Sequence, residues 1–293
     1  TGLTLVEVLV ASAVGLVLLA VVAAAVASAG WTSDRVAVEA ALLEDTRAAA
    51  DLITDEVARA IFVYPPGTTL RLNAGVSAFT RNPVGPRLGS NTWLVGRDPV
   101  LAFVQAPRLP GSRVTCDPAR DEGGASRYAC AEFVAYYAVR RGEVVAATRT
   151  AGGTERSSSP GRDPENEGGW LLYEYRRTLP LRTLARAPWS PAPLGPPALG
   201  GATPDLVADH VLPGGFEVTF ETCAGVRDED AGSCAATTPS TVGDGNPNVT
   251  ALTGRVTLRA GTRRAGRTRA LAPITVTFAP PTLDVLTPAP AGE

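Results

Sequence analysis

The feature that most constrains this chain is a charge-free apolar segment near its N-terminus. Residues 8–33, 26 in all, contain no Asp, Glu, Lys or Arg. As an α-helix rising about 1.5 Å per residue, the segment would extend roughly 39 Å, more than a hydrocarbon core of about 30 Å. A cleaved signal peptide has an apolar region of only about 7–15 residues. We therefore predict a helix that spans a membrane.

One carboxylate stands at the start of this segment. Glu7 directly precedes the apolar run and follows Leu3, Thr4, Leu5 and Val6. A carboxylate is costly to bury in lipid and requires a partner. A free α-amino group on a neighbouring chain would be a suitable positive charge.

The sequence GLTLVEVLVA at residues 2–11 resembles the prepilin processing motif of type IV pilins and type II secretion pseudopilins. The resemblance implies that prepilin peptidase cuts between Gly2 and Leu3 and methylates the new amino terminus. Residues 1–2 would then be the end of a leader. It also implies that Glu7 pairs with the amino terminus of an adjacent subunit during filament assembly.

Two departures from the motif of the major pilins point to a low-copy component. Leu3 stands where major pilins usually carry Phe, and Ala24 stands where many have a proline. Within the family the chain is most similar to PilW-like minor pilins and next to the J-type minor pseudopilin. Looser similarities at residues 169–177 and 206–211 support that placement.

A second helical pattern follows the apolar segment. We expect residues 3–30 to form the transmembrane and filament-core helix, and residues 31–64 to continue it as an amphipathic helix packed on a globular domain. A coiled-coil partner helix is the alternative. Pro65, Pro66 and Gly67 should end the helix. The apolar residues that recur every three or four positions are Val38, Leu42, Ala49, Ile53, Val57, Ile61 and Tyr64.

The remaining sequence is typical of a β-rich head over residues 67–282, followed by a C-terminal tail at 283–293. A hairpin turn is predicted at residues 140–143. One long helix with an antiparallel sheet gives an α+β fold of the pilin type. The predicted strands are residues 70–72, 92–95, 100–105, 132–140, 144–150, 169–178, 216–221, 254–260 and 274–278.

Four cysteines indicate the compartment of the head. Cys116, Cys130, Cys223 and Cys234 allow three disulfide pairings, among which the sequence does not choose. The spacing between them does not fit a zinc site. Two structural disulfides are expected, which places the head in an oxidising, extracytoplasmic compartment.

No catalytic motif stands out, so we expect neither an enzyme nor a cofactor. His210 is the only histidine and is expected to be structural. Asp244, Asn246 and Asn248 resemble the oxygen-rich start of a calcium loop, but the glycine is misplaced and no bidentate glutamate follows. A solvated turn is the expected structure there, with calcium as the alternative.

Charge is nearly balanced over the whole chain, with a formal net charge of −2 and no lysine among the 27 basic residues. This balance gives the chain as a whole no electrostatic attraction to nucleic acid or anionic lipid. The one basic cluster contains Arg263, Arg264, Arg267 and Arg269. It is expected to be the tip of a hairpin, with a phosphate contact to DNA as the alternative.

These observations together predict a minor type IV pilin, a structural subunit that assembles into or primes a pilus. Its expected partners are other pilins, prepilin peptidase, the inner-membrane assembly platform and the membrane before assembly. The chain would span the inner membrane once with its head outside and then enter an extracellular filament. The alternatives are a type II secretion minor pseudopilin and a pilus-borne adhesin that binds DNA or surfaces.

Overall fold

The computed structural model describes residues 4–64, 66–72, 77–105, 130–150, 160–180, 204–224, 235–236, 249–264 and 266–278. The chain divides into two compact units, residues 1–44 and residues 45–293. Helix α1 contributes residues to both units, and each unit is described by itself below.

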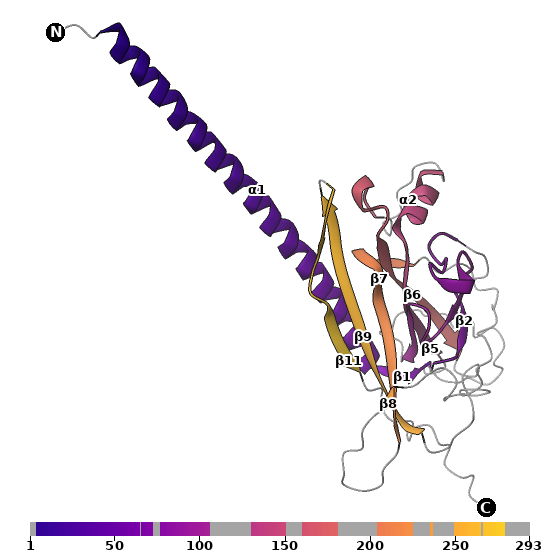
Figure 1. The fold of residues 1–293 in the computed structure, drawn as a ribbon. Coiled ribbons are helices and arrows are strands. Elements are labelled where there is room, and N and C mark those ends of the chain that lie inside the picture. Colours follow the sequence, from indigo (N-terminus) through magenta and orange to yellow (C-terminus); the bar gives the residue numbers. More distant parts are fainter. Residues whose placement is uncertain are drawn as a thin grey trace, which may run out of the picture. The chain divides into compact units, whose positions relative to one another are not determined.

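Figure 1 shows the elements of both units. The helices are α1 (Leu5–Ala58) and α2 (Arg141–Thr150), with short 3-10 turns η1 (Gly85–Arg87) and η2 (Pro164–Asn166). The strands are β1 (Ala60–Val63), β2 (Thr69–Arg71), β3 (Thr92–Leu94), β4 (Val100–Gln105), β5 (Cys130–Arg140), β6 (Trp170–Pro180), β7 (Asp205–Ala224), β8 (Ala235–Ala236), β9 (Val249–Arg264), β10 (Arg267–Ala270) and β11 (Ile274–Phe278). One long helix with an antiparallel sheet confirms the predicted α+β class.

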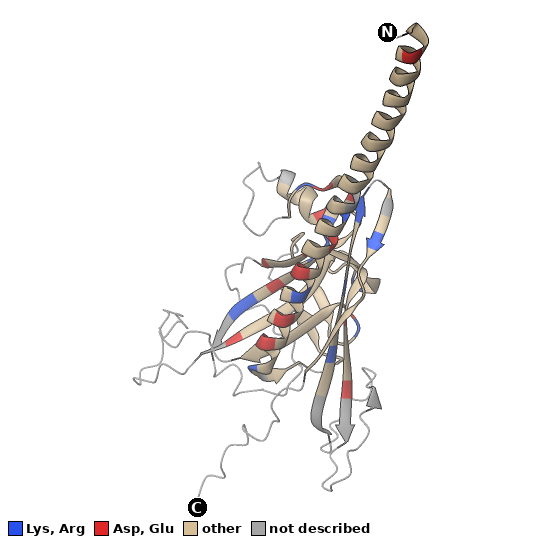
Figure 2. Ribbon diagram, turned by 90° about the vertical axis from the view of Figure 1, so that its left-hand side faces the viewer, with Lys and Arg blue, Asp and Glu red and all other residues tan. Residues whose placement is uncertain are grey.

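The first unit is the N-terminal part of α1. Every residue from Thr4 to Gly30 is exposed, including the large apolar side chains. Figure 2 shows one acidic position near the start of the helix, followed by a long stretch without charge. This helix is long and apolar enough to cross a membrane, and its exposed apolar surface needs lipid or other apolar segments to cover it.

The second unit begins with the last turns of α1. Ala49, Ile53 and Val57 are at most 2% exposed and belong to the core of the head. Their spacing of four residues places them on one helical face, as the sequence predicted. The amphipathic packing is therefore confirmed for this part of the helix.

The predicted end of the helix was wrong. The helix ends at Ala58, and residues 60–63 form β1, which pairs antiparallel with β4 through Val63 and Phe103. The prediction had continued the helix through Ile61 to Tyr64. Beyond Ala58 the helical spacing is continued by only two apolar residues, Ile61 and Tyr64. Pairing of residues 60–63 with β4 outweighs that weak helical preference.

The sheet of the head is antiparallel in every described pairing. Its main path runs β1-β4-β5-β6-β7-β9-β10, with β11 also on β9 and β8 on β7, while β2 and β3 form a separate pair. β4 and β11 have the predicted bounds. β2, β3, β5, β6, β7 and β9 overlap predicted strands, whereas β1, β8 and β10 were not predicted. Strand β7 is much longer than the predicted residues 216–221.

Residues 144–150 are helical, which corrects both the predicted strand there and the hairpin turn at 140–143. α2 begins at Arg141, directly after β5, and buries Val144 and Val145. The two neighbouring valines suggested a strand, but a short apolar run does not separate strand from helix. The predicted hairpin would have paired residues 144–150 with β5. That position beside β5 is taken by β6, with Arg140 opposite Trp170.

Strand β7 contains a bulge that positions several polar side chains. Trp170 pairs with Val211 and Leu172 with Ala208, so β7 uses one more residue than β6 over this stretch. His210 takes up the extra length with a φ of 57°, the one positive φ among the described non-glycine residues. A bulge of this kind turns its side chains away from the regular alternation.

Candidate functional sites

The first candidate site is the start of α1. The Oε2 of Glu7 accepts hydrogen bonds of 2.9 Å from both the backbone amide and the hydroxyl of Thr4. The Glu7 amide lies 3.4 Å from the Thr4 hydroxyl oxygen. This reciprocal arrangement is a capping box, in which Thr4 caps the helix and Glu7 occupies its third position.

The capping box has a readable sequence signature, Thr followed three residues later by Glu, that our sequence analysis did not use. It satisfies one oxygen of Glu7 within the chain. Among the described residues no hydrogen bond to Oε1 is found. Gly2 and Leu3, the predicted processing residues, lie outside the described residues.

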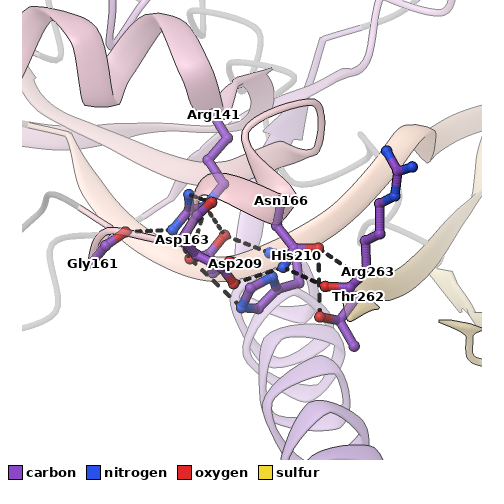
Figure 3. Close-up of polar contacts among 8 residues, drawn as sticks. All are labelled: Arg141, Gly161, Asp163, Asn166, Asp209, His210, Thr262 and Arg263. Atoms are coloured by element: carbon purple, nitrogen blue, oxygen red, sulfur yellow. Dashed lines mark hydrogen bonds and ion pairs between the residues drawn. The ribbon is translucent and has the colours of Figure 1, made fainter. Parts of the chain in front are cut away.

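The second candidate site is built on the β7 bulge and is drawn in Figure 3. Arg141, 1% exposed, donates from Nε to Asp209 Oδ1 at 2.9 Å and from Nη2 to Asp209 Oδ2 at 3.2 Å. Its guanidinium also donates to the backbone oxygens of Asp163 and Gly161. One buried arginine therefore ties the start of α2 to the bulge and to the loop before η2.

The other polar groups of this site are largely engaged with one another. His210 donates its backbone N–H to Asp209 Oδ1, and its Nε2 lies 3.9 Å from Asp209 Oδ2. Burial and the Asp209 carboxylate raise the pKa of the neighbouring Tyr173, while Arg141 opposes that shift. The Nδ1 of His210 is buried without a partner among the described atoms.

Asn166 links the same site to β9. Its Oδ1 accepts the Arg263 backbone N–H at 2.6 Å, and its Nδ2 donates to the Arg263 carbonyl oxygen at 3.2 Å and to Asp163 Oδ2 at 2.6 Å. The side chain thus pairs with a strand backbone as another strand would. This contact holds the β9–β10 hairpin close to its turn.

A third polar group gathers around Arg176 in β6. Its guanidinium pairs with Glu56 at 2.9 Å, with Glu132 at 3.0 Å and with Glu174. Glu56 is fully buried and also pairs with Arg59, and Gln105 donates to both Glu56 and Glu132. Within the described parts of the chain, no group of three metal-ligating side chains could hold an ion. This Arg176 cluster joins the end of α1 to β4, β5 and β6.

The basic segment forms the predicted hairpin. Arg264 pairs with Arg267 and Arg263 with Thr268 across β9 and β10, and Gly266 has a φ of 75° in the turn. Arg263 and Arg264 are exposed, whereas the side chain of Arg267 is not among those described. Like charges directly opposite each other on two strands are unfavourable.

The remaining predicted sites lie largely outside the described residues. This holds for Cys116 and Cys234 and for the calcium candidates Asp244, Asn246 and Asn248. The backbone places Cys130 at the first residue of β5, opposite Pro180, and Cys223 near the end of β7, opposite Ala251. The disulfides therefore stay predictions.

Comparison with known proteins adds no family assignment to these features: no protein-family model, no curated protein and no solved structure matches the chain.

Proposed function

We propose that this chain is a minor type IV pilin, a non-catalytic subunit that is held in the inner membrane and then assembled into a filament. The observation that carries the proposal is the start of α1. A single carboxylate, Glu7, directly precedes 26 residues without charge, and the whole of residues 4–30 is exposed. An exposed apolar helix with a carboxylate at its N-terminal end suits lateral packing against the helices of other pilins, where a neighbour's amino terminus supplies the opposite charge.

The rest of the molecule supports the same role. The head is a separate compact unit with its own core, so it would fold outside the membrane while the helix stays in lipid. The site on the β7 bulge and the Arg176 cluster tie elements of the head together. A structural subunit requires such internal ties, and prepilin peptidase and the assembly platform would act only on the N-terminal unit. A minor pseudopilin of type II secretion is the alternative, because it shares the same N-terminal features.

The test of this proposal must separate two roles of Glu7. In the capping box Glu7 stabilises the start of its own helix, whereas in assembly it would pair with a neighbouring subunit. Three variants of the full chain are compared in the native host: Glu7→Val, Thr4→Val and Glu39→Gln. Glu39 belongs to the same unit and forms an exposed pair with Arg35 at 3.1 Å. Membrane insertion and presence in sheared filaments are measured by immunoblot.

All three variants should insert in the membrane, since the apolar run is unchanged. Only Glu7→Val should be missing from filaments, while Thr4→Val keeps the carboxylate and should be incorporated. Loss of incorporation in Thr4→Val equal to that in Glu7→Val would show that Glu7 acts only as a helix cap. Normal incorporation of Glu7→Val would reject the assembly role.

A further inference from the structure

Strand β11 lies beside β9 at one end of the sheet (Figure 1), and its outer edge has no partner in the described structure. Ile274 to Phe278 pair residue by residue with β9 in an unbroken register. No other backbone hydrogen bond joins this strand to a described residue. On an edge strand, every second residue directs its amide and carbonyl away from the sheet. β11 therefore offers backbone groups to a further strand.

The preceding part of the same edge is protected against such pairing. β10 carries Arg267 and Arg269, and charged residues on an edge disfavour the addition of a strand. The chain between β10 and β11 contains Pro273 and has one residue more than β9 has over the same length, a bulge that interrupts the edge. β11 itself contains no charged residue, proline or glycine. The protection thus stops where β11 begins.

The apolar face of β11 is incompletely covered. Val256 of β9 is 1% exposed, whereas Val276, directly opposite it, is only half-buried against the core. Ile274 is half-buried as well. Residues directly opposite each other on neighbouring strands lie on the same face of a sheet, so the core continues to this edge and is partly open there. A further strand with apolar residues at matching positions would cover it.

We infer that this strand comes from a second copy of the chain, with the two β11 strands paired antiparallel about a two-fold axis at Val276. The sequence ITVTF has the same pattern of apolar residues and threonines in both directions. Pairing about Val276 therefore places Thr275 opposite Thr277 of the partner subunit, and apolar residues opposite apolar residues. Such cross-strand pairs are favourable. The contact is isologous and closes at two copies, with about four to six main-chain hydrogen bonds.

This symmetry also determines which copies can meet. The two-fold axis stands perpendicular to the sheet and reverses every direction within its plane. The last turns of α1 pack on this sheet through Ala49, Ile53 and Val57, so they run in opposite directions in the two copies. The contact therefore joins heads that belong to different membranes or filaments, not neighbours in one membrane. It goes beyond the proposed assembly role and does not depend on it.

The test exchanges charge at the two exposed threonines of β11. One variant of the full chain carries Thr275→Arg/Thr277→Arg, and the other carries Thr275→Glu/Thr277→Glu. Each variant places like charges opposite each other in its own dimer, whereas a mixture places opposite charges there. The control makes the same substitutions at Thr219 and Thr268, which are exposed on β7 and β10. Glu7 is unchanged throughout, so a failure here is distinct from a failure of the assembly role.

Self-association is measured by sedimentation velocity in density-matched zwitterionic micelles over a wide range of protein concentration. The parent chain and the controls should dimerise. Each charge variant should raise Kd at least about tenfold, because two like-charged pairs replace two threonine pairs. An equal mixture of the two variants should recover the parent Kd, which also shows that both variants fold. A monomeric parent, variants that dimerise as the parent does, or a mixture without recovery would overturn the inference.

Hydrogen exchange locates the contact within the chain. In the parent, amides of Ile274 to Phe278 should gain protection as the protein concentration rises, and in either charge variant alone they should not. Protection that is independent of concentration would mean that the edge is covered within one chain, and would overturn the proposal.

Vesicles that carry the full chain with its head outward test the reversed arrangement. Parent vesicles should cluster, as measured by light scattering, and vesicles that carry one charge variant should stay dispersed. Vesicles with the arginine variant should cluster with those that carry the glutamate variant. Dispersed parent vesicles, despite dimers in micelles, would contradict the two-fold pairing.

Discussion

Arg141 and Asp209 form a two-contact ion pair between residues 68 positions apart in the sequence, with Nε–Oδ1 at 2.9 Å and Nη2–Oδ2 at 3.2 Å. The two partners differ in access to water, because the Arg141 side chain is 1% exposed and the Asp209 side chain is 23% exposed. This difference predicts an asymmetric response to mutation.

Asp209→Ala should destabilise the head more than Arg141→Met does. The first variant leaves a buried guanidinium without its carboxylate, at a cost of about 3–5 kcal/mol, whereas the second leaves a carboxylate that water can reach. Urea unfolding of the full chain in micelles, followed by tryptophan fluorescence, measures both. Arg255→Gln breaks the exposed Arg255–Glu221 pair at 3.7 Å and should change stability by less than about 1 kcal/mol. Equal losses in Asp209→Ala and Arg141→Met would contradict the burial argument.

Glu56 provides a second test of burial. Its carboxylate is fully buried and pairs with Arg59 and Arg176. Glu56→Ala should lower the free energy of unfolding by about 3 kcal/mol or more, since it breaks a buried ion-paired network. Asp55→Ala changes the adjacent but exposed position and should have little effect in the same urea titration. A small loss for Glu56→Ala would mean that Glu132 and Glu174 satisfy Arg176 without it.

Gly254 lies directly beneath an aromatic ring. A Cβ at this position would lie 2.1 Å from Cζ of Phe278, so Gly254→Ala must displace the ring and should cost about 1–3 kcal/mol. Gly168→Ala meets no atom within 4 Å and serves as the control. Phe278→Leu in the Gly254→Ala background should recover part of the loss relative to the sum of the two single variants. Additive losses would show that the contact is not the cause.

Stability should fall in alkaline solution because of buried tyrosines. Tyr137 is fully buried and donates its hydroxyl to the Phe79 carbonyl oxygen at 2.8 Å, and burial raises its pKa. Burial also raises the pKa of Tyr64 and Tyr173. Below about pH 10 the folded and unfolded states are both protonated, so these groups have no effect. Above that pH the unfolded state loses protons first, and stability decreases by up to about 1.4 kcal/mol per pH unit for each such tyrosine.

Tyr137→Phe isolates one of these contributions. At neutral pH the variant should be less stable by about 1 kcal/mol, since it loses one hydrogen bond. Between pH 10 and pH 11 its stability should decline less steeply than that of the parent, as measured by urea unfolding at each pH. An unchanged slope would mean that Tyr137 ionises in the folded head at its ordinary pKa.

The fold class and most of the strands could be predicted from the sequence. The assignment of helix or strand was wrong for two short segments next to the ends of elements. Alternating polar and apolar residues located β11, in which every second residue is exposed. β4 was located instead from a short apolar run, and all six of its residues are buried. The Ile61–Tyr64 and Val144–Thr150 segments were misassigned because a short apolar run fits either a helix or a strand. Glu7 was found from sequence, whereas the Arg141 and Arg176 groups were not, since no local pattern connects Arg141 with Asp209 or Glu56 with Arg176.

The sequence by itself determined the exposed apolar helix, the one carboxylate at its start and the basic composition of the β9–β10 hairpin. These are local properties, which depend on consecutive side chains and on the period of a helix or strand. Only the tertiary structure decided that α1 ends at Ala58 and that α2 follows β5. It also decided that the Asn166 side chain hydrogen-bonds to the backbone of Arg263 in β9. Those features depend on hydrogen bonds and burial between residues far apart in the chain, whose free energy becomes available only when the sheet has formed.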